Sequence, residues 1–263
     1  MHVRQYGTSG PHAAVLHGGP GAPGYMAPVA RQLANACRVV EPMQRGSGDV
    51  PLTVARHVAD LDDVLTSRIH GAPTALVGHS WGAMLALAFA AEYPDRVASL
   101  VLIGCGTFTL AARNRMHALL DRRKNNALRQ ALERLAFEYP EPNEQLARRA
   151  ALTLPLYSYD VDSSAADFGA CDAQAHSETW NDMLRLQQAG VYPEAFRRID
   201  RPVIMLHGAA DPHPGDMIRD SLQPFLPQLE YVEWERCGHY PWLEPVRDEF
   251  FNALTTWLER RTK

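Results

Sequence analysis

The sequence predicts an α/β fold, in which a mostly parallel, doubly wound sheet carries helices on both faces and a helical cap insertion. Three observations predict it. Short apolar runs alternate with helical patterns in residues 13–103 and again in residues 203–258. The runs of the first stretch are continuously apolar, as strands are when helices cover both faces of a parallel sheet. Between these stretches, only helical patterns occur.

The first part of the chain carries the expected elements in strict alternation. Strands are expected at residues 13–16, 38–40, 74–78 and 97–103, and helices at residues 25–35, 53–69 and 82–92. In the second helix, Val54, Val58 and Leu61 recur at a spacing of three or four, which places them on one face. A β-α-β-α order of this kind predicts a parallel sheet.

The pattern changes at Gly104. Helical stretches follow, such as residues 113–134, 144–152 and 178–188, without a strong strand signal. The alternation then resumes, with strands expected at 203–206 and 230–234 and helices at 217–225 and 244–258. We therefore expect a core formed by residues 1–104 and 199–263, and a helical cap formed by residues 105–198.

The composition excludes several classes of protein. Hydrophobic residues make up 46% of the chain and charged residues 21%, which is ordinary for a globular protein. The formal net charge of -4 gives no basic footprint for nucleic acid. The chain shows no apolar run of about 20 residues and no signal-peptide pattern, so we expect a cytoplasmic protein without membrane contact. The sequence does not indicate an oligomeric state.

The four cysteines give no indication of a metal site. They are widely separated, form no CxxC pair, and join no Cys/His cluster with zinc-ligand spacing. We expect four reduced thiols, no metal and no organic cofactor. The expected partner is a small-molecule substrate.

Residues 78–82 read GHSWG and match the GxSxG pattern around Ser80. The pattern alone is weak, but it lies between an expected strand and an expected helix, which is the setting of a nucleophile elbow. In such a turn, flanking glycines avoid a clash and the serine hydroxyl stands clear of the sheet. The context favours Ser80 as a nucleophile over an ordinary turn serine.

A serine hydroxyl needs a base that takes its proton, and the base needs an acid that orients it. In this kind of sheet the order along the chain is serine, acid, histidine. Asp211 follows the expected strand 203–206, and His239 follows the expected strand 230–234. Because open α/β sheets place their sites at the carboxyl ends of strands, we expect Ser80, Asp211 and His239 to converge.

Other acids and histidines compete less well for these roles. Asp216 lies at the expected start of a helix, where a carboxylate commonly caps the N-terminus. His213 could line the site entrance or be a plain loop histidine. The remaining strand-end histidines, which we expect to be structural or to line the pocket, are His17, His79 and His207.

An acyl-transfer site also needs donors for the oxyanion. One is expected to be the backbone N–H of Trp81, the residue after the nucleophile. The other should come from residues 17–21 (HGGPG), which follow the first expected strand. We favour Gly19, while Gly18 and Gly21 remain alternatives.

These motifs together resemble the α/β-hydrolase fold family, and the resemblance covers nearly the whole chain. Residues 17–21 resemble the HGGPG loop of proline iminopeptidases, residues 44–48 are similar to their DQRGSGxS segment, and residues 80–82 are similar to their GGSWG elbow. The resemblance implies that Ser80, Asp211 and His239 form a triad, with Gly19 and Trp81 as oxyanion donors.

The sequence departs from the peptidase motifs at three places. Met43 stands where the loop motif has its Asp, Asp49 stands where its last Ser is expected, and His79 replaces a Gly of the elbow. The resulting GHSWG is common among esterases, lactonases and carbon–carbon bond hydrolases of the fold. An aminopeptidase would also need cap carboxylates for the substrate amine. Glu178 and Asp182 are the candidates, or else surface helix residues.

The expected function is therefore a serine hydrolase that acts through an acyl-enzyme on a small to medium carboxylic ester or related acyl substrate. The alternatives are an aminopeptidase of the proline iminopeptidase kind and a non-catalytic member of the fold that binds a small ligand. Aromatic cap residues either form an apolar substrate pocket or pack the cap onto the core. They are Phe108, Tyr157 and Trp180, with Tyr159 and Phe168 beside them.

Overall fold

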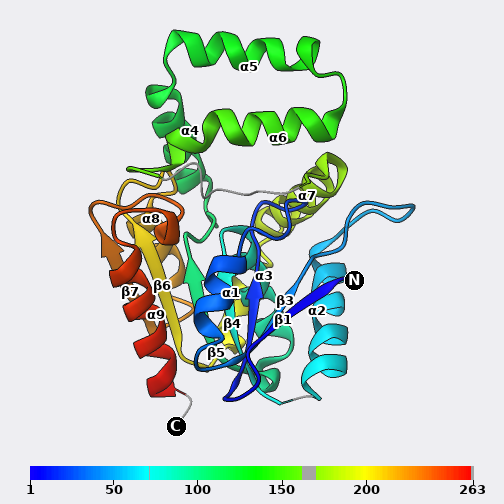
Figure 1. Cartoon of the computed structure of the whole chain (residues 1–263), viewed down its shortest axis with the longest axis vertical. Coiled ribbons are helices and arrows are strands. Elements are labelled where there is room, and N and C mark those ends of the chain that lie inside the picture. The colour runs from blue at the N-terminus through cyan, green and yellow to red at the C-terminus, as the bar shows by residue number, and fades with distance from the viewer. Residues whose placement is uncertain (71, 162–169, 262–263) are drawn as a thin grey trace.

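A computed structural model describes residues 1–70, 72–161 and 170–261 (Figure 1). The seven strands in this part of the chain form one sheet, in the order β1-β3-β2-β4-β5-β6-β7. They are β1 (Val3–Tyr6), β2 (His12–Leu16), β3 (Arg38–Pro42), β4 (Thr74–His79), β5 (Val97–Ile103), β6 (Val203–Gly208) and β7 (Leu229–Trp234). Every neighbouring pair is parallel except β1 with β3. The predicted fold class is confirmed.

The helices either cover this sheet or lie between β5 and β6. Those that connect or follow the strands are α1 (Ala27–Leu33), α2 (Val54–Ile69), α3 (Trp81–Glu92), α8 (Gly215–Leu222) and α9 (Arg247–Arg261). Those of the insertion are α4 (Leu110–Arg123), α5 (Asn126–Glu138), α6 (Pro142–Thr153) and α7 (Ala173–Gln188). In Figure 1, α5 and α6 run side by side at the top of the view, at the opposite end from the C-terminus.

The two faces of the sheet bury different sets of side chains, because successive strand residues point to opposite faces. Leu76 and Leu102 belong to an apolar cluster with residues of α2, α3 and α8. Val77 and Ile103, one position further along each strand, belong to a second cluster with residues of α1 and α9. Helices on both faces explain why the central strands read as continuously apolar.

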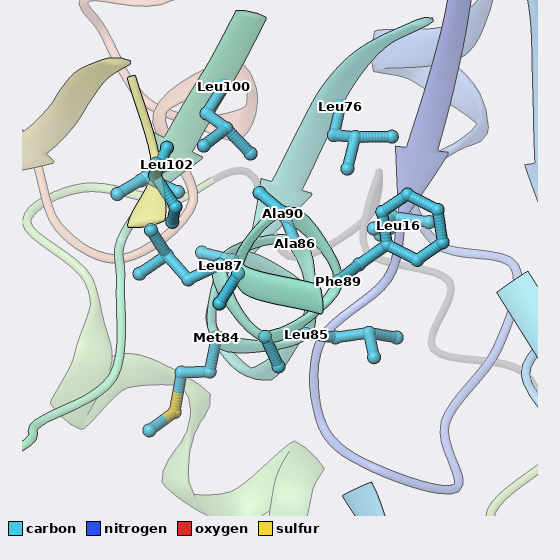
Figure 2. Close-up of a cluster of buried hydrophobic side chains, with 14 of the residues drawn as sticks. Leu16, Leu76, Met84, Leu85, Ala86, Leu87, Phe89, Ala90, Leu100 and Leu102 are labelled. Carbon is cyan, nitrogen blue, oxygen red and sulfur yellow. The ribbon is translucent and has the colours of Figure 1, made fainter. Parts of the chain in front are cut away.

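Helix α3 is buried on all sides, and Figure 2 shows its side chains packed among those of β2, β4 and β5. Every residue from 81 to 91 is buried. Burying each large apolar side chain contributes about 1.5–3 kcal/mol, so this helix is firmly held. The turn that precedes it, which carries Ser80, therefore starts from a fixed support.

Some sequence expectations need correction. The expected helix 113–134 is two helices, because Asn125 accepts a hydrogen bond from the N–H of Leu128 and begins α5 anew. Strand β1 was not expected, and its short, largely exposed sequence carries no periodic signal. The boundaries of the other expected helices also shift, so that α1 begins at Ala27 and α9 at Arg247.

The insertion contacts the core through α7 and the residue that caps it. The Asp172 side chain accepts hydrogen bonds from the N–H of Ala175 in α7 and from the N–H of Ser47 in the core. The Asp172 N–H donates to the carbonyl of Gly21 at 2.7 Å. The division into core and cap at residues 105 and 198 remains a prediction. None of the described helices is long and apolar enough to cross a membrane.

Candidate active site

The residues of the candidate site follow four parallel strands, at the edge of the sheet where those strands have their carboxyl ends. The 17–21 loop follows β2, Ser80 follows β4, Asp211 lies three residues beyond β6, and His239 lies beyond β7. Strand order reverses between β2 and β4, since β3 lies on one side of β2 and β4 on the other. Such switch points are where open α/β sheets bind ligands.

The backbone around Ser80 has the geometry expected of a nucleophile elbow. Ser80 has φ 54° and ψ -116°, which is a strained conformation for a residue with a side chain. A Cβ on Gly78 would lie 2.3 Å from the carbonyl oxygen of Gly82, and one on Gly82 would lie 2.2 Å from that of Leu16. Both glycines are therefore required by close backbone contact. The Ser80 N–H donates to the Ile103 carbonyl at 2.8 Å, which holds the turn on β5.

Asp211 and His239 are in direct contact. The Nδ1–H of His239 donates to Oδ2 of Asp211 at 2.5 Å, and each residue is 3% exposed. A proton on Nδ1 leaves the lone pair on Nε2, which is the form that a general base requires. The N–H of His239 also donates to the carbonyl of Tyr157 at 2.7 Å. His239 and Ser80 both line the same cavity.

A second histidine holds the other oxygen of the same carboxylate. Both Nδ1–H and the backbone N–H of His213 donate to Oδ1 of Asp211 at 2.9 Å, and the His213 ring stacks on His239 at 4.7 Å. Burial would raise the pKa of Asp211, but the two histidines outweigh it and hold that pKa well below its usual range. His213 thus lines the cavity and is more than a plain loop residue.

Ligand atoms of Asp211, His213 and His239 lie within 4.8 Å of one another, close enough for a metal ion to be considered. Both imidazoles, however, donate Nδ1–H to the carboxylate. These hydrogen bonds account for the cluster.

A chain of hydrogen bonds joins the loops on either side of Ser80. His79 donates from Nε2 to the carbonyl of His239 at 2.9 Å, and its Nδ1 accepts from the hydroxyl of Tyr25 at 2.7 Å. The Tyr25 oxygen in turn accepts the N–H of Gly18 at 2.7 Å. Burial holds the pKa of His79 well below its usual range, so the ring is neutral and this direction of donation is fixed.

The same contacts separate the alternative oxyanion donors. The Gly18 N–H already donates to the Tyr25 hydroxyl oxygen. The Gly21 carbonyl accepts the N–H of Asp172, so Gly21 is in contact with the insertion. Gly19, with φ 42°, lines the cavity beside Ser80. Trp81 is the first residue of α3, where a backbone N–H has no acceptor within the helix. Gly19 and Trp81 remain the best placed of the candidates.

Gln44 links the two sides of this candidate oxyanion hole. Its Oε1 accepts from the indole N–H of Trp81 at 2.8 Å, and its Nε2 donates to the carbonyl of His17 at 2.7 Å. Its backbone N–H donates to Nε2 of His17 at 3.0 Å, and burial lowers the pKa of that histidine to about 4. The sequence indicated a polar loop here but not this bridge.

A cavity of about 270 Å³ lies over Ser80. Tyr157 and Trp180 of the insertion are among its lining residues. The expectation for Phe108 needs correction. Phe108 is absent from the described lining residues and is 4% exposed, with its ring edge-to-face on Phe196 at 5.2 Å. Both rings belong to the apolar cluster that includes residues of α3 and β5, so Phe108 packs against the core. Phe168 lies outside the described residues.

The two cap carboxylates considered for amine binding are engaged elsewhere. Glu178 accepts the backbone N–H of Leu52, and Asp182 accepts that of Val54, both at 2.8 Å. They hold α7 to the start of α2, and neither is among the described residues that line the cavity.

If His239 acts as a general base, it is expected to remain neutral below the pH at which an ordinary histidine becomes protonated. Burial lowers the pKa of His239 below 6.5, and the Asp211 charge opposes this only in part. Because the base must be neutral, the acid limb of kcat/KM should have its midpoint below pH 6.5. The pH profile of kcat/KM measures this midpoint, and a midpoint above pH 7 would contradict the assignment of His239 as the base.

Comparison with known proteins identifies the family of this chain. The profile of the alpha/beta hydrolase family matches residues 14–253. A probable proline iminopeptidase from Streptomyces coelicolor is 36% identical over 162 residues. That match covers 53% of this chain and 46% of the relative, so the chain spans about half the length of that protein.

Two further relatives match over almost their whole length. A pimeloyl-[acyl-carrier protein] methyl ester esterase from Chromobacterium violaceum is 28% identical, with 95% of both chains covered. The structure of a thermophilic esterase from Thermogutta terrifontis superposes with a TM-score of 0.66 at 20% identity, covering 100% of this chain and 94% of that one. At this identity the structural likeness shows the fold alone.

Proposed function

The chain belongs to the alpha/beta hydrolase family, and we propose that it is a serine hydrolase that cleaves a small to medium carboxylic ester through an acyl-enzyme on Ser80. One observation carries the proposal. The strained turn of Ser80 and the buried Asp211–His239 pair meet at one cavity. The hydrolase relatives support the same reaction class.

In the proposed reaction, His239 takes the Ser80 proton on Nε2 as the hydroxyl oxygen attacks the ester carbonyl carbon. Asp211 keeps the proton of His239 on Nδ1 and stabilises the imidazolium that forms. The oxyanion accepts hydrogen bonds from the N–H groups of Gly19 and Trp81, and loss of one such donor costs about 3–4 kcal/mol in comparable sites.

Collapse of this intermediate breaks the bond to the alcohol, which leaves with the proton from His239. Water then attacks the acyl-enzyme by the same route, releases the acid and restores Ser80. We propose that the segment 105–198 acts as a cap and supplies Tyr157 and Trp180 to the substrate pocket.

The aminopeptidase alternative has support from the 17–21 loop and from the Streptomyces relative. Against it, Glu178 and Asp182 are already committed to backbone N–H groups of the core. The described lining of the cavity contains no Asp or Glu that could hold an α-amino group. These contacts favour an ester substrate over a substrate with a free α-amino group.

We expect the purified protein to hydrolyse 4-nitrophenyl butyrate with a kcat/KM at least about 100-fold above that for proline 4-nitroanilide, because nothing in the described pocket pairs with the amine. Steady-state kinetics with the Ser80→Ala protein as the blank would measure the ratio. A ratio that favours the anilide would overturn the ester assignment and support the aminopeptidase.

A further inference from the structure

One face of α6 forms a wall of the cavity above Ser80. Leu146, Arg149, Ala150 and Thr153 line it, and their spacing of three, one and three places them on a single helical face. Three of these four side chains are uncharged, and Arg149 is the exception. Arg149 therefore brings the one guanidinium found among the described lining residues.

The Arg149 carbonyl accepts from the Thr153 hydroxyl, but its guanidinium has no protein partner within the part of the chain that the structure describes. No hydrogen bond or ion pair there engages its guanidinium, which has five N–H donors. The adjacent Arg148 is different, since it pairs with Glu144 at 3.4 Å and lies over the Tyr139 ring at 4.9 Å. Arg148 therefore pairs with neighbours on the helix surface, whereas Arg149 lines the cavity with its N–H donors available.

The other charges at the cavity favour an anion. The described lining holds no Asp or Glu, and the nearby Asp211 carboxylate already accepts from His239 and His213. Another lining residue, His176, donates its Nδ1–H to the carbonyl of Pro20. No acidic residue in this lining neutralises the charge of Arg149. Binding of a negatively charged group is therefore favoured there, and binding of a cationic substrate is disfavoured.

We propose that Arg149 binds a carboxylate on the acyl chain of the substrate, so that the preferred esters are half-esters of dicarboxylic acids. This inference rests on the proposed esterase function. The Tyr157 ring, which follows α6 in the chain, lies 5.6 Å from the His239 ring. Arg149 lines the same cavity about one helical turn, roughly 6 Å, before Thr153 at the end of α6. The carboxylate is therefore separated from the ester carbonyl by several methylenes.

The test compares two esters with the same six-carbon acyl length, mono-4-nitrophenyl adipate and 4-nitrophenyl hexanoate. We expect Arg149→Gln to lower kcat/KM for the adipate about tenfold, mainly through KM, and to change the hexanoate value less than about twofold. Arg149→Lys should restore part of the loss. Arg148→Gln is the matched control, one residue away and already paired, and should leave both values unchanged.

The outcomes distinguish this inference from the proposed function. If the hexanoate is hydrolysed in a Ser80-dependent way but Arg149→Gln affects both esters equally or neither, the carboxylate site is wrong and the esterase stands. If neither ester is hydrolysed by the unaltered protein, the esterase function itself fails. Raising the salt concentration should raise KM for the adipate alone, because an ion pair at an exposed arginine is screened.

Discussion

Replacing Ser80 with alanine is expected to lower kcat for an ester about 100,000-fold, because removal of a triad nucleophile leaves only binding and oxyanion stabilisation. The protein should still fold. Ser80 makes its structural contact through its backbone N–H, which an alanine keeps, and the supporting helix α3 is unaffected. Steady-state kinetics and thermal unfolding of the variant measure both effects.

Ser177→Ala is the control for this substitution, since Ser177 is an exposed serine on α7, and it should leave kcat unchanged. A Ser80→Ala protein that retained more than about a hundredth of the activity would contradict the nucleophile assignment, given the losses expected when a triad serine is removed.

Asp211→Asn is expected to lower kcat about 10,000-fold, because the amide cannot hold the Nδ1 proton as a carboxylate does and the base adopts the wrong tautomer. The Asp211 charge also raises the pKa of His239. Its removal should therefore move the acid limb of the residual activity to lower pH. A full pH profile of the variant measures both effects.

Asp216→Asn separates the two acids in this loop. Asp216 lies in the first turn of α8, where its Oδ1 accepts the N–H of Met217. Within the described residues it forms no hydrogen bond or ion pair with His239. Its loss should cost less than about 1 kcal/mol of stability, as loss of a helix N-terminal carboxylate does, and should leave kcat unchanged. A larger kcat loss for Asp216→Asn than for Asp211→Asn would contradict the assignment of the acid.

The residues that could be predicted from sequence are those whose position follows from strand ends. Ser80 and Asp211 follow strands with a clear apolar signal, and His239 follows one with an alternating pattern. Parallel strands bring their carboxyl ends to one edge. The alternation of strands and helices likewise indicated the sheet. Such arguments place a residue at an edge but do not specify which side chains meet there.

For that reason, the hydrogen bonds that support the triad and the 17–21 loop could not be predicted from the sequence. Tyr25 reads as an apolar member of a helix pattern, yet its hydroxyl joins Gly18 to His79. Gln44 reads as a loop residue, yet it bridges Trp81 and the 17–21 loop. Each role depends on tertiary contacts between segments far apart in the chain.

Periodicity also left the insertion ambiguous. A helical pattern shows which residues share a face but not what that face covers. The sequence therefore did not distinguish Arg149, which lines the cavity, from Arg148, which pairs with Glu144. The aromatic character of Phe108 was equally compatible with a pocket or with packing, and the structure places it against Phe196.

The central claim is that Ser80 is a nucleophile activated by His239 and Asp211. Its most direct test is mass spectrometry of the protein after reaction with a fluorophosphonate, followed by peptide mapping. The account predicts one adduct, on the peptide that contains Ser80, which is absent in Ser80→Ala and forms much more slowly in Asp211→Asn. A protein that hydrolyses esters but carries its adduct elsewhere, or carries none, would contradict it.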